Sequence, residues 1–116
     1  MREKVEIFKV LSEINRVRIL MMLLNKSLCV CEITNVLQLS TATVSNHLAY
    51  LRDCGFIEDS KDGKWINYRI ANSTEGSMVR TILELLPNWF SKEEIVINDI
   101  QKILSVDRFT LKNMCS

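Results

Sequence analysis

Two short amphipathic segments joined by a tight turn, at residues 30–38 and 40–53, constrain the fold more than any other feature of the chain. Apolar residues recur at helical spacing in both segments. The positions expected to face inward are Ile33, Val36, Leu37, Val44, Leu48 and Leu51. Ser40 is a suitable N-cap for the second helix, because its hydroxyl can accept a hydrogen bond from an unpaired backbone N–H. Together, residues 30–53 are typical of a helix-turn-helix.

A β-hairpin is predicted directly after this helix pair, over residues 56–70. Its strands are residues 56–60 and 65–70, and the Asp62-Gly63 pair between them is a hairpin-turn signal. A helix pair followed by a two-stranded wing describes a winged helix-turn-helix. The predicted fold class is therefore mainly α with a small β-hairpin.

The rest of the chain is predicted to form helices that complete a single domain over residues 1–116. Two helices precede the helix pair and two follow the wing within residues 74–104, with a tail at 105–116 that has no clear period. The four helices are expected at 2–12, 15–25, 74–86 and 91–104. Pro87 is expected to end the third of them, and Ser91 with Glu94 to form a capping box for the fourth.

Apolar side chains in the first and last of these helices are expected to pack inward. The positions concerned are Ile7, Phe8, Leu11 and Ile14 near the N-terminus, and Ile97, Ile100, Ile103 and Leu104 near the C-terminus. The chain is 47% apolar and 25% charged, which is ordinary for a globular protein. No segment has the apolar length of a membrane span, and acidic residues stand where a signal peptide would be basic. A cytoplasmic location is expected.

The net charge of +1 does not indicate a nucleic-acid-binding protein, so any DNA binding must come from locally placed charged groups and not from bulk charge. The outer face of the second helix carries small polar side chains, which can contact base edges or phosphates in a major groove. Tyr50 and Arg52 are expected nearer the DNA backbone, and Lys61 and Lys64 of the wing at phosphates. The expected readers are Ser40, Thr41, Thr43, Ser45 and Asn46. The alternative is a solvated helix face beside an ordinary basic turn.

The four cysteines are more consistent with thiol chemistry than with a disulfide framework in a cytosolic protein. Cys29 and Cys31 stand where the helix at 30–38 begins. Side chains two residues apart in a regular helix diverge by about 200°, but their sulfurs can converge if the first lies on non-helical backbone. A helix N-terminus should lower thiol pKa values, and soft thiolates bind thiophilic ions. The alternative is one buried cysteine beside a chance neighbour.

Three further residues are candidate ligands. Cys54 is expected to be packed and Cys115 to be a free thiol in the tail, although either could supply a third sulfur. His47 is the only histidine. A packed or hydrogen-bonded role is favoured for it over that of a metal ligand or a catalytic base.

Residues 5–70 resemble the ArsR/SmtB family of winged-helix metal-sensing repressors. The segments that carry the resemblance are Leu28-Cys29-Val30-Cys31-Glu32-Ile33, Val44-Ser45-Asn46-His47-Leu48, Leu51-Arg52-Asp53-Cys54-Gly55-Phe56 and Asp62-Gly63-Lys64-Trp65. The resemblance implies a homodimer built from the first helix and the helix after the wing. It also implies binding to an inverted-repeat operator in double-stranded DNA until an inducer binds. The Leu-Cys-Val-Cys segment resembles the arsenic and antimony branch, in which thiolates of the third helix hold As(III) or Sb(III).

Two departures from the family patterns matter. In the best-known arsenic pattern a third cysteine follows three residues after Cys31, where this chain has Thr34. As(III) would then bind Cys29 and Cys31 alone, or recruit Cys54, Cys115 or a small thiol. Cadmium and lead sensors add N-terminal cysteines, which are absent here. Zinc sensors use histidines in the helix after the wing, whereas residues 74–104 contain none.

Other functions remain open from the sequence. A redox-responsive repressor would pair Cys29 or Cys31 with Cys54 or Cys115. A winged-helix module that binds protein instead of DNA would also suit the near-neutral charge. An enzyme is not expected, because the chain has no second histidine, no phosphate-cradling glycine loop and no recognisable carboxylate pair.

Overall fold

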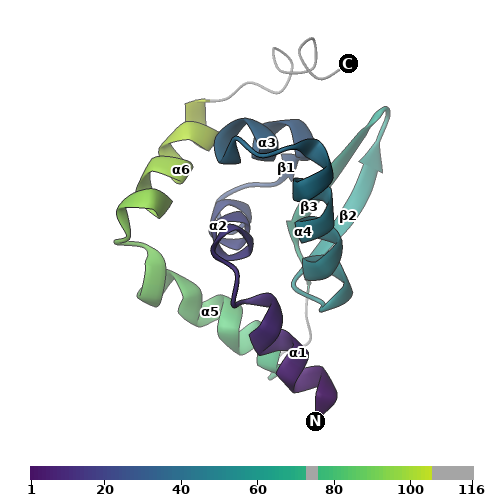
Figure 1. Cartoon of the computed structure of the whole chain (residues 1–116), viewed down its shortest axis with the longest axis vertical. Coiled ribbons are helices and arrows are strands. Elements are labelled where there is room, and N and C mark those ends of the chain that lie inside the picture. Colours follow the sequence, from purple (N-terminus) through teal and green to yellow (C-terminus); the bar gives the residue numbers. More distant parts are fainter. Residues whose placement is uncertain (73–75, 106–116) are drawn as a thin grey trace.

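A computed structural model of the chain describes residues 1–72 and 76–105. The elements in chain order are α1 (Arg2–Val10), α2 (Ile14–Leu23), β1 (Leu28–Cys29), α3 (Val30–Leu37), α4 (Thr41–Asp53), β2 (Ile57–Asp62), β3 (Trp65–Ile70), α5 (Met78–Phe90) and α6 (Glu94–Ser105). Helix α2 lies at the centre, with α3 and α4 beside it and α5 and α6 around the other side (Figure 1). The hairpin of β2 and β3 projects past α4. The predicted winged helix-turn-helix is confirmed.

The core is aliphatic and forms around α2. Ile19, Leu20 and Met22 of this helix are fully buried. The expected inward stripe of α4 is confirmed, since Val44, Leu48 and Leu51 are each 0% exposed. The buried faces of α3, α5 and α6 close over the same cluster of side chains. The helix-turn-helix is therefore held rigidly on α2, with the opposite face of α4 left to solvent.

The sheet has a third strand that the sequence did not predict. Strand β1 has two residues and pairs antiparallel with β3, so the strand order is β1-β3-β2. Leu28 lies opposite Tyr68, and Cys29 lies opposite Asn67. The hairpin itself closes with a two-residue loop between Asp62 and Trp65, where Gly63 adopts a φ of 62°. The wing is thus hydrogen-bonded to the segment that opens α3.

The C-terminal helices begin and end at different residues from those predicted. Ser77 is the N-cap of helix α5, which starts at Met78 and runs through Pro87 to Phe90. The proline removes one backbone hydrogen bond from the helix. The buried side chains of α5 before it and a hydrogen bond from the Ser91 N–H to the Pro87 carbonyl (3.1 Å) stabilise the helix on both sides of Pro87. Ser91 is therefore the C-cap of α5, and the expected capping box at the start of α6 is wrong. Residues 73–75 and 106–116, which include the predicted start of the helix at 74 and most of the tail, lie outside the described residues.

Four apolar side chains expected in the core face outward instead. Phe8 and Ile14 are 64% and 63% exposed, and Ile97 and Leu104 are 41% and 69% exposed. Ile103 is buried as expected, and Val10 and Val96 are buried in place of the four exposed residues, together with Asp99. These helices carry apolar residues on two sides, so helical spacing alone does not show which side meets the core. The α1 face that remains uncovered is rich in apolar side chains. No helix within the described ranges is long and apolar enough to cross a membrane.

A buried ion pair joins the central helix to α6. Arg18 donates from two nitrogens to both carboxylate oxygens of Asp99, at 2.8 and 2.9 Å, and Asp99 is 2% exposed. The hydrogen bond to Asp99 is the main reason that the pKa of Arg18 is raised. The guanidinium also donates to Asn15 at 3.0 Å. The pair fixes the place of α6 against α2.

Replacing Arg18 with methionine is expected to lower the free energy of unfolding by about 3 kcal/mol, because the variant leaves the Asp99 carboxylate buried without its partner. Chemical denaturation followed by circular dichroism measures this loss. The double variant Arg18→Met/Asp99→Leu should recover most of it, since no charge then remains buried. Equal losses in the single and double variants would show that packing, and not the charge, accounts for the effect.

Candidate functional site

The outer face of α4 presents the small polar side chains that the sequence singled out. Thr41, Ser45 and Asn46 are exposed, and so are Ser40 and Thr43 at the start of the helix. The Ser40 hydroxyl oxygen accepts a hydrogen bond from the Thr43 backbone N–H at 3.1 Å, as a Ser N-cap should, and also donates to the Thr43 hydroxyl at 2.9 Å. Ser40 and Thr43 therefore hold the start of α4, while Thr41, Ser45 and Asn46 point freely outward.

Tyr50 and Arg52 make contacts inside the protein. The Tyr50 hydroxyl donates to the carboxylate of Glu6 in α1 at 2.9 Å, and this bond is the main cause of the raised pKa of Tyr50. Arg52 donates to Asp59 of β2 at 3.2 Å and is 42% exposed. The two residues tie α4 to α1 and to the wing. Their expected contacts with the DNA backbone stay predictions.

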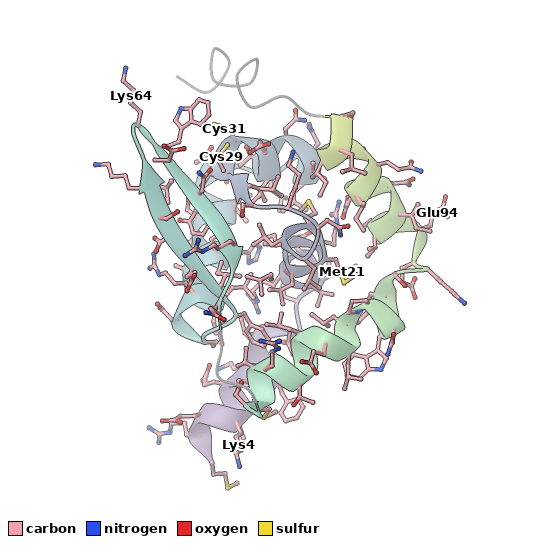
Figure 2. All side chains as sticks on the ribbon, turned by 180° about the vertical axis from the view of Figure 1, so that it is seen from behind. Lys4, Met21, Cys29, Cys31, Lys64 and Glu94 are labelled. Carbon is pink, nitrogen blue, oxygen red and sulfur yellow. The ribbon has the colours of Figure 1, made fainter. Side chains whose placement is uncertain are left out.

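The two lysines of the wing are exposed. The sequence predicts both of them in the turn between the strands, but only Lys64 lies there. Lys61 belongs to β2, opposite Ile66 of β3. Lys64 lies in the hairpin loop and projects from its tip (Figure 2). Neither lysine forms an ion pair with another residue in the described part of the chain, so both can reach a phosphate.

Cys29 occupies the junction between the sheet and α3. It is the last residue of β1 and the N-cap of α3, with extended backbone angles of φ −89° and ψ 166°. The expectation that the first cysteine lies on non-helical backbone is thus confirmed. Cys29 is 6% exposed and Cys31, in the first turn of α3, is partly exposed. Figure 2 shows the two side chains near one another at the end of the molecule that carries the hairpin tip.

Glu32 is a buried acid beside Cys29, and the sequence does not single it out as a functional residue. Its carboxylate accepts a hydrogen bond from the Cys29 backbone N–H at 3.0 Å, and its own N–H faces the Cys29 sulfur, forming a reciprocal capping box. Glu32 is 2% exposed. Glu32 follows Cys29 by three residues, which is the spacing of a capping box. The pattern was not recognised because a capping box usually has serine or threonine at the N-cap position, where this chain has cysteine.

The pKa of Cys29 is raised, which corrects the expectation that the helix N-terminus would lower it. Burial is the main cause, because a thiolate loses more than a thiol when it is removed from water. The Glu32 carboxylate also raises the pKa, whereas the Glu32 backbone N–H lowers it. In the folded protein at neutral pH, Cys29 is thus a protonated thiol.

The structure does not bring Cys54 to this pair of cysteines. Cys54 lies at the end of α4 and lines a cavity of about 760 Å³ with residues of α1, including Glu6. Helix α1 is at the opposite end of the molecule from the labelled cysteines (Figure 2). Cys115 lies outside the described residues. Thr34, at the position of the family's third cysteine, is one turn along α3 from Cys31 and donates its hydroxyl to the Cys31 carbonyl at 2.9 Å.

His47 has the packed role that the sequence favoured. Its Nδ1 is 3.4 Å from a guanidinium nitrogen of Arg16, and its Nε2 is 3.8 Å from the Glu13 carboxylate. Residues 1–72 and 76–105 contain no cluster of three or more histidines, cysteines or acids arranged to hold a metal ion. Any ion at Cys29 and Cys31 would complete its coordination with other donors.

Comparison with known proteins places this site in a family. Residues 14–59 match the family model described as "Bacterial regulatory protein, arsR family". The chain is 33% identical to the arsenical resistance operon repressor of Escherichia coli (strain K12), over 97% of this chain and 95% of that protein. It is 39% identical to the cadmium resistance transcriptional regulatory protein CadC of Listeria innocua serovar 6a, over 77% of this chain and 71% of that protein.

The fold is also similar to that of solved structures. The fold matches HlyU from Vibrio cholerae N16961 with a TM-score of 0.67 and 33% identity, over 78% of this chain and 95% of that chain. These relatives are named as a repressor, a transcriptional regulatory protein and, for HlyU of Vibrio cholerae, a transcriptional activator. The chain belongs to the ArsR family of DNA-binding transcriptional regulators.

Proposed function

We propose that this protein is a homodimeric repressor that binds an inverted-repeat operator through α4 and the wing, and that As(III) or Sb(III) bound by Cys29 and Cys31 releases it. The observation that carries the proposal is the place of Cys29. One residue supplies a thiol, caps α3 and pairs with the wing strand β3. The 33% identity to an arsenical resistance operon repressor over nearly the whole chain supports the choice of inducer.

The position of Cys29 gives a physical route from ion to DNA. Cys29 is held by the Glu32 capping box and by the antiparallel pairing of its strand β1 with β3, so an ion that draws its sulfur toward Cys31 must compete with the capping box and with the strand pairing. The capping box fixes the start of α3, which packs on α4, and the strand pairing fixes β3 of the wing. The ion therefore favours an arrangement of α3, α4 and β3 that differs from the one held by the Cys29 contacts. A difference in ion affinity between two arrangements is the condition for coupling ion binding to DNA binding.

The protonated state of Cys29 suits trivalent arsenic. Arsenous acid condenses with two thiols to form two As–S bonds, and each thiol proton leaves with an arsenic hydroxide as water, so no net proton is released. A divalent ion such as Cd²⁺ must instead displace both thiol protons into solvent. With the pKa of Cys29 raised, Cd²⁺ affinity should increase as the pH rises toward that pKa, while arsenite affinity should stay nearly constant.

Exposed apolar side chains support the homodimer. Val5 and Phe8 of α1 are 54% and 64% exposed, and Leu85 and Trp89 of α5 are 36% and 55% exposed. Both helices lie at the same end of the molecule (Figure 1). A second copy packed on these faces would remove the apolar surface from water and place two α4 helices for the two half-sites of an inverted repeat.

A mobility-shift experiment with the reduced protein and a fragment of its own promoter tests the proposal. The complex is challenged in parallel with arsenite, antimonite, Cd²⁺, Pb²⁺ and, without reductant, hydrogen peroxide. We expect release by arsenite and antimonite at micromolar concentrations. If only Cd²⁺ or Pb²⁺ releases the DNA, that ion is the inducer in place of arsenic or antimony. If only peroxide releases it, the result favours the redox-responsive repressor. Failure to bind the fragment at low salt would favour a module that binds protein.

Replacing Thr34 with cysteine is expected to tighten arsenite binding about tenfold or more, equivalent to about 1.4 kcal/mol. The new sulfur would lie one helical turn from Cys31, where the Thr34 hydroxyl now contacts the Cys31 carbonyl. Arsenite titration followed by tryptophan emission measures the affinity, with Thr34→Ser as the matched control. An affinity unchanged from that of the control would mean that this position does not face the bound ion.

A further inference from the structure

Arg16, in the first turn of α2, completes the end of α1. Its Nε donates to the Val10 carbonyl at 2.6 Å, and a terminal nitrogen lies 3.4 Å from the Lys9 carbonyl. The last carbonyls of a helix have no partners within the helix and need donors from elsewhere. Arg16 therefore fastens the C-terminal end of α1 to α2.

The same guanidinium also holds α4. Its other terminal nitrogen is 3.4 Å from Nδ1 of His47, and its Cζ carbon lies 4.6 Å from the centre of the Tyr50 ring. His47 and Tyr50 are three residues apart and so share one face of α4. A guanidinium only donates, so this contact is a hydrogen bond in the tautomer whose Nδ1 carries no proton. The other ring nitrogen, Nε2, lies 3.8 Å from the Glu13 carboxylate.

Two further contacts close the network around Arg16. The Tyr50 hydroxyl donates to Glu6 of α1, so α4 is bonded to α1 directly as well as through the arginine. The Glu13 carboxylate accepts from the Arg16 backbone N–H at 3.0 Å and caps α2. The buried side of α4 is thus tied by polar groups to the helix that carries the exposed apolar residue Phe8.

We propose that Arg16 is a positioning residue for operator recognition, which sets the orientation of α4 relative to α1 and so the separation of the two α4 helices in a dimer. The inference rests on the proposed function, in which α4 reads DNA and α1 joins two copies. In a two-fold dimer, the distance and angle between reading helices must match the spacing of the half-sites. The Arg16 network is the polar connection that passes from the dimer helix to the reading helix.

The test compares dissociation constants for the operator and for an operator with one extra base pair between its half-sites. The extra pair moves one half-site by about 3.4 Å and rotates it by about 35°. We expect Arg16→Gln to weaken binding to the natural operator about tenfold and to lose most of the preference between the two spacings. Arg80→Gln, which removes an exposed arginine paired with Glu84, should leave both constants unchanged.

Salt dependence separates positioning from phosphate contact. Arg16→Gln should keep the slope of log K against log salt, whereas Lys64→Ala should reduce it by about 0.9, the value for one phosphate contact. His47→Leu removes one of the two α4 contacts of Arg16 and should reduce the spacing preference in the same direction, which keeps the inference testable if Arg16→Gln does not fold.

Three results would overturn the inference. The first is a lower melting temperature of Arg16→Gln with an intact spacing preference, which shows a merely structural role. The second is a reduced salt slope, which makes Arg16 a phosphate contact. The third is an intact spacing preference in His47→Leu. The variant Ser45→Ala/Asn46→Ala tests the proposed function separately, because it should weaken binding to both operators equally. If that variant binds normally, the assignment of α4 as the reading helix fails, whatever Arg16 does.

Discussion

Cys31→Ser is expected to bind the operator as the wild type does and to need at least about 100-fold more arsenite for release, equivalent to about 2.7 kcal/mol of lost coupling. Cys29→Ser should behave in the same way. Serine at position 29 retains an oxygen that can accept from the Glu32 N–H, so the cap of α3 and the folded protein should survive. Only the sulfur that we propose as a ligand of the ion is lost. Anisotropy of a labelled operator, with arsenite added to the reduced complex, measures the effect.

Cys54→Ser provides the matched control for these variants. Cys54 is also partly buried, but it lies in the cavity beside α1, at the other end of the molecule from Cys31. Its replacement should leave release by arsenite within about twofold of the wild type. Normal release in both Cys29→Ser and Cys31→Ser would contradict the proposed site. Impaired release in Cys54→Ser would instead make that cysteine a ligand, supplied across the dimer.

Phe8→Glu is expected to separate the dimer and to weaken operator binding by about 10²- to 10⁴-fold, the range by which joining two binding modules raises affinity. Phe8 is 64% exposed in the single chain, so the change should not disturb the core. A carboxylate at this position would be buried against a second copy, which is unfavourable without a partner. Sedimentation velocity gives the state of association, and anisotropy gives the affinity.

Leu104→Glu is the control for the added charge. Leu104 is 69% exposed in the last turn of α6, which Figure 1 places at the other end of the molecule from α1. This variant should remain dimeric and bind the operator normally. A dimeric Phe8→Glu with full operator affinity would show that α1 does not form the interface.

The helix-turn-helix was predictable because its signals are local. The burial of Val44, Leu48 and Leu51 follows from the 3.6-residue period of the helix. The N-cap role of Ser40 follows from its place directly before the helix. The errors arose where the answer depends on a partner distant in sequence. Phe8 was read as core because its face of α1 is apolar, as a face covered by a second copy would also be. Strand β1 was missed because two residues carry no period, and its pairing partner is about 40 residues away.

The candidate ion site was predicted in position but not in its chemistry. The spacing of Cys29 and Cys31 suggested that one sulfur lies on extended backbone, which the structure confirms. The direction of the Cys29 pKa was wrong, because the helix terminus was considered without the burial that outweighs it. Sequence spacing gives no measure of burial. For the same reason Glu32, an acid in a largely apolar surrounding, could not be recognised as buried.

The most direct test of the central claim is a titration of arsenite into the reduced protein bound to its labelled operator, with anisotropy as the measure of bound DNA. We predict complete release with an endpoint at one arsenic per protomer, unaffected by pH between about 6 and 8 because condensation with two thiols releases no net proton. Tight operator binding that arsenite does not alter would contradict the account. The ArsR-family regulator would then respond to another signal, and the role given to Cys29 and Cys31 would be withdrawn.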